Sequence, residues 1–428
     1  MSCHIRRFVP ILMSSAAMVA SCWISAQQAQ ESAEQSKPTI HEDVNVLLVP
    51  VVVRDAQDRA IGDLKKEDFS VLDQGKPRTI SRLTVEKPSI HSSDTNKSTE
   101  PAPAPSGGAV AQPPAALRRF VVFLFDDRHL SAADLIQAKT AASRMLDESL
   151  AGSDWASVVS TSGGGSGMTH DHAKLLSTIL SLKTHLGFMA DEHTCPYISY
   201  YSADQIINKN NPAEVAVAIA DTIVCSHVDG HVAAEAMMTS AAQHSLSVGE
   251  EDARTSLEFV RNIVQTMAVL RGQKTLIFVS PGFLSISEPA MNLESQILNS
   301  AAAADVTIST LDARGLFNSF LGASQEVPTL AGIVTRQESH ADSMRANQSV
   351  LAELADGTGG RFFHSNNDLE SGLKNLASAP EYLYLLEISL QGIKPNGLYH
   401  QLKVKVDRKD LKVQARKGYF APYVKKQK

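Results

Sequence analysis

Short apolar segments alternate with amphipathic segments through the middle of the chain. Residues 120–125, with the sequence FVVFLF, form a continuous apolar run that is typical of a strand buried on both faces of a parallel sheet. Further strands are predicted over residues 155–160, 275–279, 306–311 and 361–363, and helices over residues 131–150, 172–182, 250–270, 293–304, 341–355 and 368–376. This alternation predicts an α/β fold with a doubly wound, mostly parallel sheet across residues 118–379.

The two regions that flank this domain have β patterns. Residues 39–87 contain β-prone runs separated by turn residues, and they predict a small N-terminal β-sandwich-like module. Residues 380–422 predict a C-terminal β extension, in which Leu402, Val404 and Val406 alternate with lysines. We therefore expect three domains, with the extension packed on the α/β domain.

Two further segments have no place in this strand and helix order. Residues 88–117 are rich in Pro, Ala and Ser and lack apolar periodicity, which indicates a linker. Residues 187–248 interrupt the α/β pattern with a cluster of Tyr, His and Cys residues. We expect this insertion to be helical over residues 212–224 and 232–244.

The N-terminal segment has the pattern of an export signal. Arg6 and Arg7 precede an apolar stretch that ends near Ala20, and residues 1–26 are predicted to be a signal peptide. The stretch is short for a stable membrane anchor, and no membrane span is predicted in the mature chain. The sequence around Cys22 also resembles a bacterial lipobox, so an alternative is cleavage before Cys22 and lipidation of that residue. Both routes place the protein outside the cytoplasm of a bacterium, either secreted, in the periplasm or on the cell envelope.

Composition and charge exclude several classes of protein. The chain has 428 residues, 43% of them hydrophobic and 20% charged, which is typical of globular proteins and excludes whole-chain disorder. The formal net charge is −6, and loss of Arg6 and Arg7 with the signal peptide leaves 38 basic and 46 acidic residues, or −8. An acidic chain of this kind is not expected to bind nucleic acid.

Export also changes how the cysteines are interpreted. Cys3 and Cys22 lie in the predicted signal peptide, which leaves Cys195 and Cys225 in the mature chain. Two cysteines in an oxidising compartment are most simply a disulfide. The alternative is a zinc site in which His193 and His227 join the two cysteines.

Several short motifs, taken in order, resemble a known family. They are Phe125-Asp126-Asp127, Lys274-Thr275-Leu276-Ile277-Phe278-Val279-Ser280, Thr358-Gly359-Gly360-Arg361 and Ala415-Arg416-Lys417-Gly418-Tyr419. Together with the order of β-module, linker and α/β domain, they resemble the VWFA-related domain proteins described from acidobacterial genomes. The resemblance implies an exported protein with a von Willebrand factor A-like fold and covers roughly residues 40–422, apart from the insertion.

The resemblance also implies a divalent cation at the C-terminal edge of the sheet. The first metal motif of this fold is Asp-x-Ser-x-Ser, and the matching stretch here offers Asp127, His129 and Ser131, with the imidazole in place of a hydroxyl. A Thr-Asp-Gly turn that supplies a later carboxylate is replaced by Ser280-Pro281-Gly282. The predicted site is therefore a degenerate metal-ion-dependent adhesion site for Mg²⁺, Mn²⁺ or Zn²⁺, and imidazole favours the last two. The structural alternative is that Asp126 and Asp127 end the strand and Ser131 caps the next helix.

A glycine-rich segment at residues 162–167 does not complete a catalytic motif. It lacks the Lys-Ser/Thr pair of a phosphate-binding loop, and Met168 replaces the last glycine of a nucleophile elbow. We therefore interpret it as a turn between elements of the sheet.

These patterns favour a non-catalytic function. The leading hypothesis is an exported binding or adhesion protein that holds a protein or cell-envelope ligand. One alternative is a metal-assisted hydrolase that acts through Asp127, His129 or the histidines of the insertion. Another is an envelope scaffold anchored by a lipid on Cys22.

Overall fold

The computed structural model describes residues 46–57, 59–87, 118–150, 154–185, 195–316, 330–394 and 398–421. The predicted signal peptide, including Cys22, and the predicted linker over residues 88–117 lie outside the described residues.

The α/β domain is built on a five-stranded parallel sheet with the strand order β6-β5-β7-β8-β9. The strands are β5 (Arg119–Phe125), β6 (Trp155–Ser160), β7 (Gln273–Ser280), β8 (Val306–Asp312) and β9 (Phe362–Phe363). All of β5 is buried, which confirms the prediction made from its apolar run. It lies inside the sheet, paired with β6 on one side and β7 on the other, and helices cover both of its faces.

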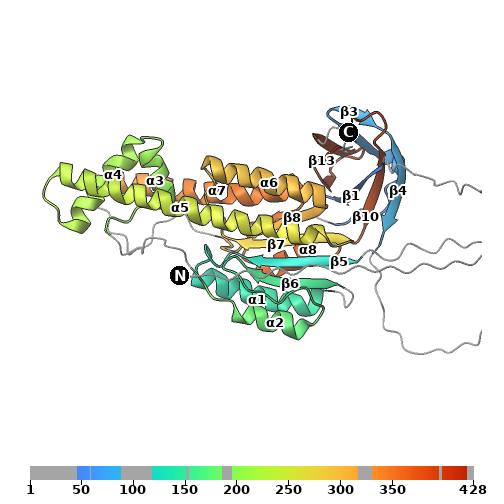
Figure 1. Ribbon diagram of the computed structural model, residues 1–428, viewed down its shortest axis with the longest axis horizontal. Helices are drawn as coiled ribbons and strands as arrows, with labels where there is room; N and C mark the ends of the chain where they lie inside the picture. The colour runs from blue at the N-terminus through green and yellow to red at the C-terminus, as the bar shows by residue number, and fades with distance from the viewer. Residues whose placement is uncertain are drawn as a thin grey trace, which may run out of the picture. The chain divides into compact units, whose positions relative to one another are not determined.

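Helices cover both faces of the sheet, as Figure 1 shows. One layer contains α1 (Ala132–Ser149), α2 (His172–Ser181) and α8 (Leu369–Ala377), and the other contains α5 (His231–Ala268), α6 (Glu288–Ala304) and α7 (Leu330–Thr358). Phe123 and Phe125 of β5 pack in the first layer, whereas Val122 and Leu124 pack in the second. This alternation follows from the two-residue period of a strand and confirms the α/β architecture.

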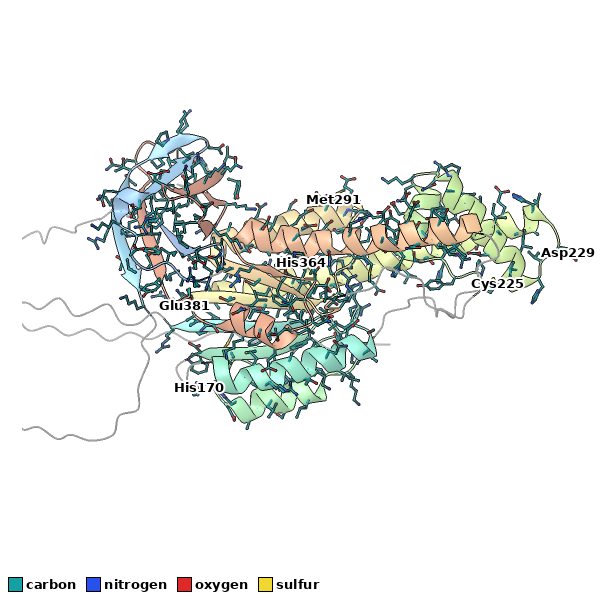
Figure 2. All side chains as sticks on the ribbon, turned by 180° about the vertical axis from the view of Figure 1, so that it is seen from behind. His170, Cys225, Asp229, Met291, His364 and Glu381 are labelled. Atoms are coloured by element: carbon teal, nitrogen blue, oxygen red, sulfur yellow. A yellow bond between two sulfur atoms is a disulfide. The ribbon has the colours of Figure 1, made fainter. Side chains whose placement is uncertain are left out.

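The insertion is a helical extension stabilised by a disulfide. It contains α3 (Tyr200–Ile207), α4 (Pro212–Ser226) and the first half of α5, and these helices share a small apolar core. Cys195 and Cys225 form the predicted disulfide, and Figure 2 shows Cys225 near the end of the extension. The bond occupies both sulfur atoms, so the zinc alternative does not describe this structure; its His193 lies outside the described residues.

The helices expected over residues 232–244 and 250–270 are one continuous helix, α5, of 38 residues. Gly249, between the two predicted segments, is not a helix end but a point of close packing. A Cβ atom at this position would lie 2.2 Å from Cγ of Tyr200, so glycine lets the ring of α3 rest directly on the α5 backbone. The glycine therefore lets α3 of the insertion pack closely against the middle of α5.

Within the described residues, no helix by itself combines the length and apolar composition of a membrane span. The consecutive helices α4 and α5 satisfy these criteria only as a pair, across a bend of 104°.

The N-terminal module and the C-terminal extension form one two-sheet domain, rather than the separate units expected from the sequence. One sheet has the order β12-β1-β10-β4 and the other has the order β13-β11-β2-β3. The N-terminal elements are β1 (Val46–Arg54), the 3-10 turn η1 (Lys66–Asp68), β2 (Phe69–Asp73), β3 (Lys76–Arg78) and β4 (Ile80–Glu86). The C-terminal elements are β10 (Leu383–Ser389), β11 (Tyr399–Val406), β12 (Lys412–Ala415) and β13 (Gly418–Phe420).

A shared apolar core explains why the two ends of the chain combine. Tyr384 of β10 is fully buried, its ring lies 5.2 Å from that of Phe69, and its hydroxyl donates to the carbonyl of Ile61 at 2.7 Å. About 50 residues bury too little apolar surface to form a stable core alone. The strand β10 therefore fills the gap between β1 and β4 and completes the N-terminal sheet.

A carboxyl pair lies between α6 and α7. Glu294 is only 7% exposed and accepts a hydrogen bond from Ser285 Oγ at 3.3 Å. Burial, reinforced by a hydrogen bond and charge repulsion from Glu353, raises the pKa of Glu294 to about 8. At neutral pH the folded protein therefore keeps a proton on this carboxyl group.

This raised pKa predicts a loss of stability towards alkaline pH. Between the ordinary pKa of 4.5 and about 8, only the folded state retains the Glu294 proton, so the free energy of unfolding falls as pH rises. Glu294→Gln should flatten this part of the profile, measured by urea denaturation between pH 5 and pH 9. Glu67→Gln, at an exposed position, should keep the wild-type slope. An unchanged slope in Glu294→Gln would show that the carboxyl group ionises normally.

Candidate functional site

Polar residues gather at the carboxyl ends of the central strands. The chain passes from β5 through α1 to β6 on one side, and from β7 through α6 to β8 on the other. The connections thus diverge between β5 and β7, which is the position where open α/β sheets bind their ligands. Asp126 and Asp127 follow β5, Thr161 and Ser162 follow β6, and Ser280 ends β7.

Asp126 is a fully buried carboxylate at the centre of this edge. It accepts hydrogen bonds from Ser280 Oγ at 2.7 Å, His129 Nδ1 at 3.0 Å and Thr161 Oγ1 at 3.1 Å. Ser256 Oγ of α5 lies 3.4 Å away. The carboxylate thereby connects three strand ends and a helix, and its lone pairs are occupied by protein donors.

His129 and Asp126 form a buried ion pair. Burial opposes ionisation of Asp126, but the charge and hydrogen bond of His129 outweigh it and hold the pKa of Asp126 below its ordinary value. Burial likewise opposes protonation of His129, yet the Asp126 carboxylate raises the pKa of this imidazole above its ordinary value. The ring of His129 stacks on Phe283, with 4.8 Å between the ring centroids.

Asp127 is also buried, and it shares Thr161 with Asp126 but otherwise contacts residues nearer the rim of the edge. Its Oδ1 accepts from Thr161 Oγ1 and from the Ser162 amide, both at 2.9 Å. Its Oδ2 accepts a short hydrogen bond from Ser162 Oγ and lies 2.9 Å from His185 Nδ1. The same nitrogen lies 3.1 Å from Ser162 Oγ, so a carboxylate, a hydroxyl and an imidazole converge. His185 is 57% exposed, and the group is open to solvent on this side.

The three residues predicted as metal ligands do not share one site. Asp127 contacts Ser162 and His185, whereas His129 contacts Asp126. Ser131 caps α1: its Oγ accepts from the Asp134 amide at 3.1 Å and donates to the Asp134 carboxylate at 2.7 Å. Ser131 is thus a helix cap, as the structural alternative proposed. Asp127 and His129 belong to two different groups of hydrogen-bonded side chains.

The Ser280-Pro281-Gly282 turn contributes a hydroxyl to the edge, and no carboxylate. Gly282 has a φ of +78° and its amide donates to Ser280 Oγ at 3.0 Å, which orients that hydroxyl towards Asp126. A Cβ atom on Gly282 would lie 2.1 Å from the carbonyl oxygen of Asn347, so both conformation and packing require glycine here.

Asp312, at the end of β8, is a further carboxylate at this edge, and protein groups already neutralise and hydrogen-bond it. It is fully buried and forms an ion pair with Arg314 at 2.7 Å and a hydrogen bond with Gln348 at 2.6 Å. In the described parts of the chain, no group of three or more His, Cys, Asp or Glu side chains is arranged to hold a metal ion. Any cation at the rim would therefore be coordinated by Asp127, His185 and the Ser162 hydroxyl, and its other ligands would be water or groups of a binding partner.

The chain matches no family model and no curated protein.

Sequence patterns missed the contributions of Thr161, Ser162, Ser256 and His185. Thr161 and Ser162 immediately follow a predicted strand, and that position was a usable signal, because residues after parallel strands meet at one edge. The glycine-rich segment beside them is the predicted turn, with positive φ at Gly163 and Gly164. No local pattern indicates His185 or Ser256, which reach the edge only through the packing of other elements.

The buried pair predicts a pH-dependent loss of stability on mutation. Asp126→Asn leaves the His129 imidazole without its counter-charge, and breaking a buried pair in this way costs about 3–5 kcal/mol. Because the pKa of His129 is raised, the ion pair contributes its full stabilisation below about pH 6.5, the pKa of an unfolded histidine. This contribution is lost as pH rises through the pKa of His129 in the folded protein. Because the pKa of Asp126 is lowered, the contribution of its carboxylate is present above about pH 3.9, the pKa of an unfolded aspartate, and it is lost as pH falls through the lower pKa of the folded protein.

Urea denaturation at pH 6 and pH 9 measures this difference. The difference in free energy of unfolding between wild type and Asp126→Asn should be larger at pH 6 than at pH 9. Asp229→Asn, at an exposed position near the end of the extension (Figure 2), serves as the control. A gap that does not change with pH would mean that His129 and Asp126 are not an ion pair.

Proposed function

We propose that this protein is an exported, non-catalytic binding or adhesion protein with a von Willebrand factor A-like domain. Its ligand, a protein or a component of the cell envelope, would contact the carboxyl edge of the sheet. The observation that carries the proposal is the convergence of Asp127, Ser162 and His185 beside a solvent-exposed surface. The disulfide of the insertion supports export, because such bonds persist in oxidising compartments.

The rim group offers a carboxylate, a hydroxyl and an imidazole to a divalent cation. His185 Nδ1 lies 2.9 Å from Asp127 Oδ2 and 3.1 Å from Ser162 Oγ. Donor atoms about 2.1 Å from one metal ion are separated by roughly 3 Å when they occupy neighbouring coordination positions. A carboxylate and an imidazole together favour Zn²⁺ or Mn²⁺ over Mg²⁺. With few protein ligands, such an ion would retain positions for an acidic group of the binding partner.

The same geometry argues against the hydrolase alternative. In a nucleophile–base relay, the imidazole uses one nitrogen for the hydroxyl and the other for the carboxylate. Here His185 presents a single nitrogen, Nδ1, to both Ser162 and Asp127. Ser162 Oγ donates directly to the carboxylate, so its proton is not directed to the base. The lipid-anchor alternative stays a prediction, because Cys22 lies outside the described residues.

Titration calorimetry with Zn²⁺ and Mn²⁺ tests the cation. The wild-type protein should bind one ion, and His185→Ala and Asp127→Asn should each weaken binding at least about tenfold through loss of a ligand. His170→Ala is the control, since this ring packs on Trp155 at the start of β6 (Figure 2) and should leave binding unchanged. Equal binding by wild type and His185→Ala would refute the rim site.

Capture from an envelope extract tests the binding function. Immobilised wild-type protein charged with Zn²⁺ should retain a component that is released by chelator and is not retained by His185→Ala. His170→Ala should retain it as the wild type does. A component that the His185 variant retains equally in chelator would contradict a cation-dependent interaction at this edge.

A further inference from the structure

A cavity of about 150 Å³ lies at the opposite, amino edge of the parallel sheet. The first residues of β7 and β8 and the last turns of α6 and α7 form one wall. Strands β1 and β12 of the two-sheet domain form another. The cavity therefore lies between the α/β domain and the two-sheet domain, is partly open to solvent, and is separate from the rim group of Asp127.

Basic side chains dominate the charge of this cavity. Four line it, namely Arg54, Lys274, Arg361 and Arg416, and the only acidic side chain among its described lining residues is Asp305. The whole chain has a net charge of −6, so the local excess of positive charge is opposite to the overall balance. Low-dielectric walls concentrate the field of such charges and attract anions.

Part of this charge is already used by the protein. Arg416 pairs with Asp305 at 3.0 Å, and Arg54 pairs with Glu381, which Figure 2 labels, at 3.1 Å. Lys274 Nζ donates to the carbonyl of Leu270 at 3.1 Å, close to the end of α5. A helix end carries only about half a negative charge, so a neutral carbonyl compensates the ammonium group incompletely.

We propose that this cavity binds a small organic anion that carries a carboxylate or phosphate group. Lys274 would pair with the anionic group, and Arg361, which also has a partner within the protein, adds positive charge on the same wall, where β7 and β9 begin. Thr275 and Thr307 line the same wall and offer hydroxyl groups to its polar atoms. The volume matches a ligand about the size of benzene, which means roughly six to ten non-hydrogen atoms.

Calorimetry and thermal unfolding of the full protein test this site, at matched ionic strength. The probes are inorganic phosphate, glycerol 3-phosphate, succinate and uncharged glycerol. At least one anionic probe should bind saturably and raise the melting temperature, whereas glycerol should not. A response to the two phosphates alone identifies a phosphate site, and a response to succinate alone identifies a carboxylate site.

Variants separate binding from general electrostatics. Lys274→Gln and Arg361→Gln should each weaken anion binding about tenfold or more, because each removes a positive charge from the wall of the cavity. Asn375→Trp, which narrows the cavity and keeps its charges, should also weaken it. Lys174→Gln removes an exposed charge on α2 outside the cavity and should change nothing.

Two results would overturn the proposal. One is the absence of saturable binding by every anionic probe in a wild-type protein that melts cooperatively. The other is equal weakening by Lys174→Gln and Lys274→Gln. Either result would show that the basic side chains serve only to neutralise helix ends and carboxylates.

Discussion

The organisation of the carboxyl edge depends on one buried carboxylate. Asp126 has no exposed surface, and a charge in that position is tolerable only with close partners. Those partners come from β6, β7, α5 and the turn after β5, in the form of Thr161, Ser280, Ser256 and His129. Satisfying a single charge therefore fixes four segments that are far apart in the sequence.

This constraint also separates the two neighbouring aspartates. Adjacent residues at the end of a strand project in different directions, so the two buried aspartates meet different groups: Asp126 contacts His129 and Ser280, and Asp127 contacts Ser162 and the exposed His185. Thr161 Oγ1 lies within 3.1 Å of both carboxylates and couples the buried pair to the rim group. Asp126 positions the edge, and Asp127, Ser162 and His185 form the group that we propose binds a cation and its ligand.

The sequence predicted features that depend on local pattern. The apolar run of β5, the capping role considered for Ser131 and the pairing of Cys195 with Cys225 all follow from neighbouring residues or compartment. Features that depend on long-range packing were missed. The pairing of β1 with β10 joins residues more than 300 positions apart, and the residues of neither strand indicate which other strand it pairs with. The site was missed for the same reason, since Asp127 and His185 are 58 positions apart and meet only in the folded chain.

We propose that the rim of the carboxyl edge binds a divalent cation through Asp127, Ser162 and His185. Anomalous X-ray diffraction from crystals grown with Zn²⁺ tests it most directly. We expect one strong anomalous peak at roughly 2.0–2.1 Å from a ring nitrogen of His185 and at a similar distance from the Asp127 carboxylate. A peak bound elsewhere on the chain, with His185 and Asp127 still in direct contact with each other, would contradict it.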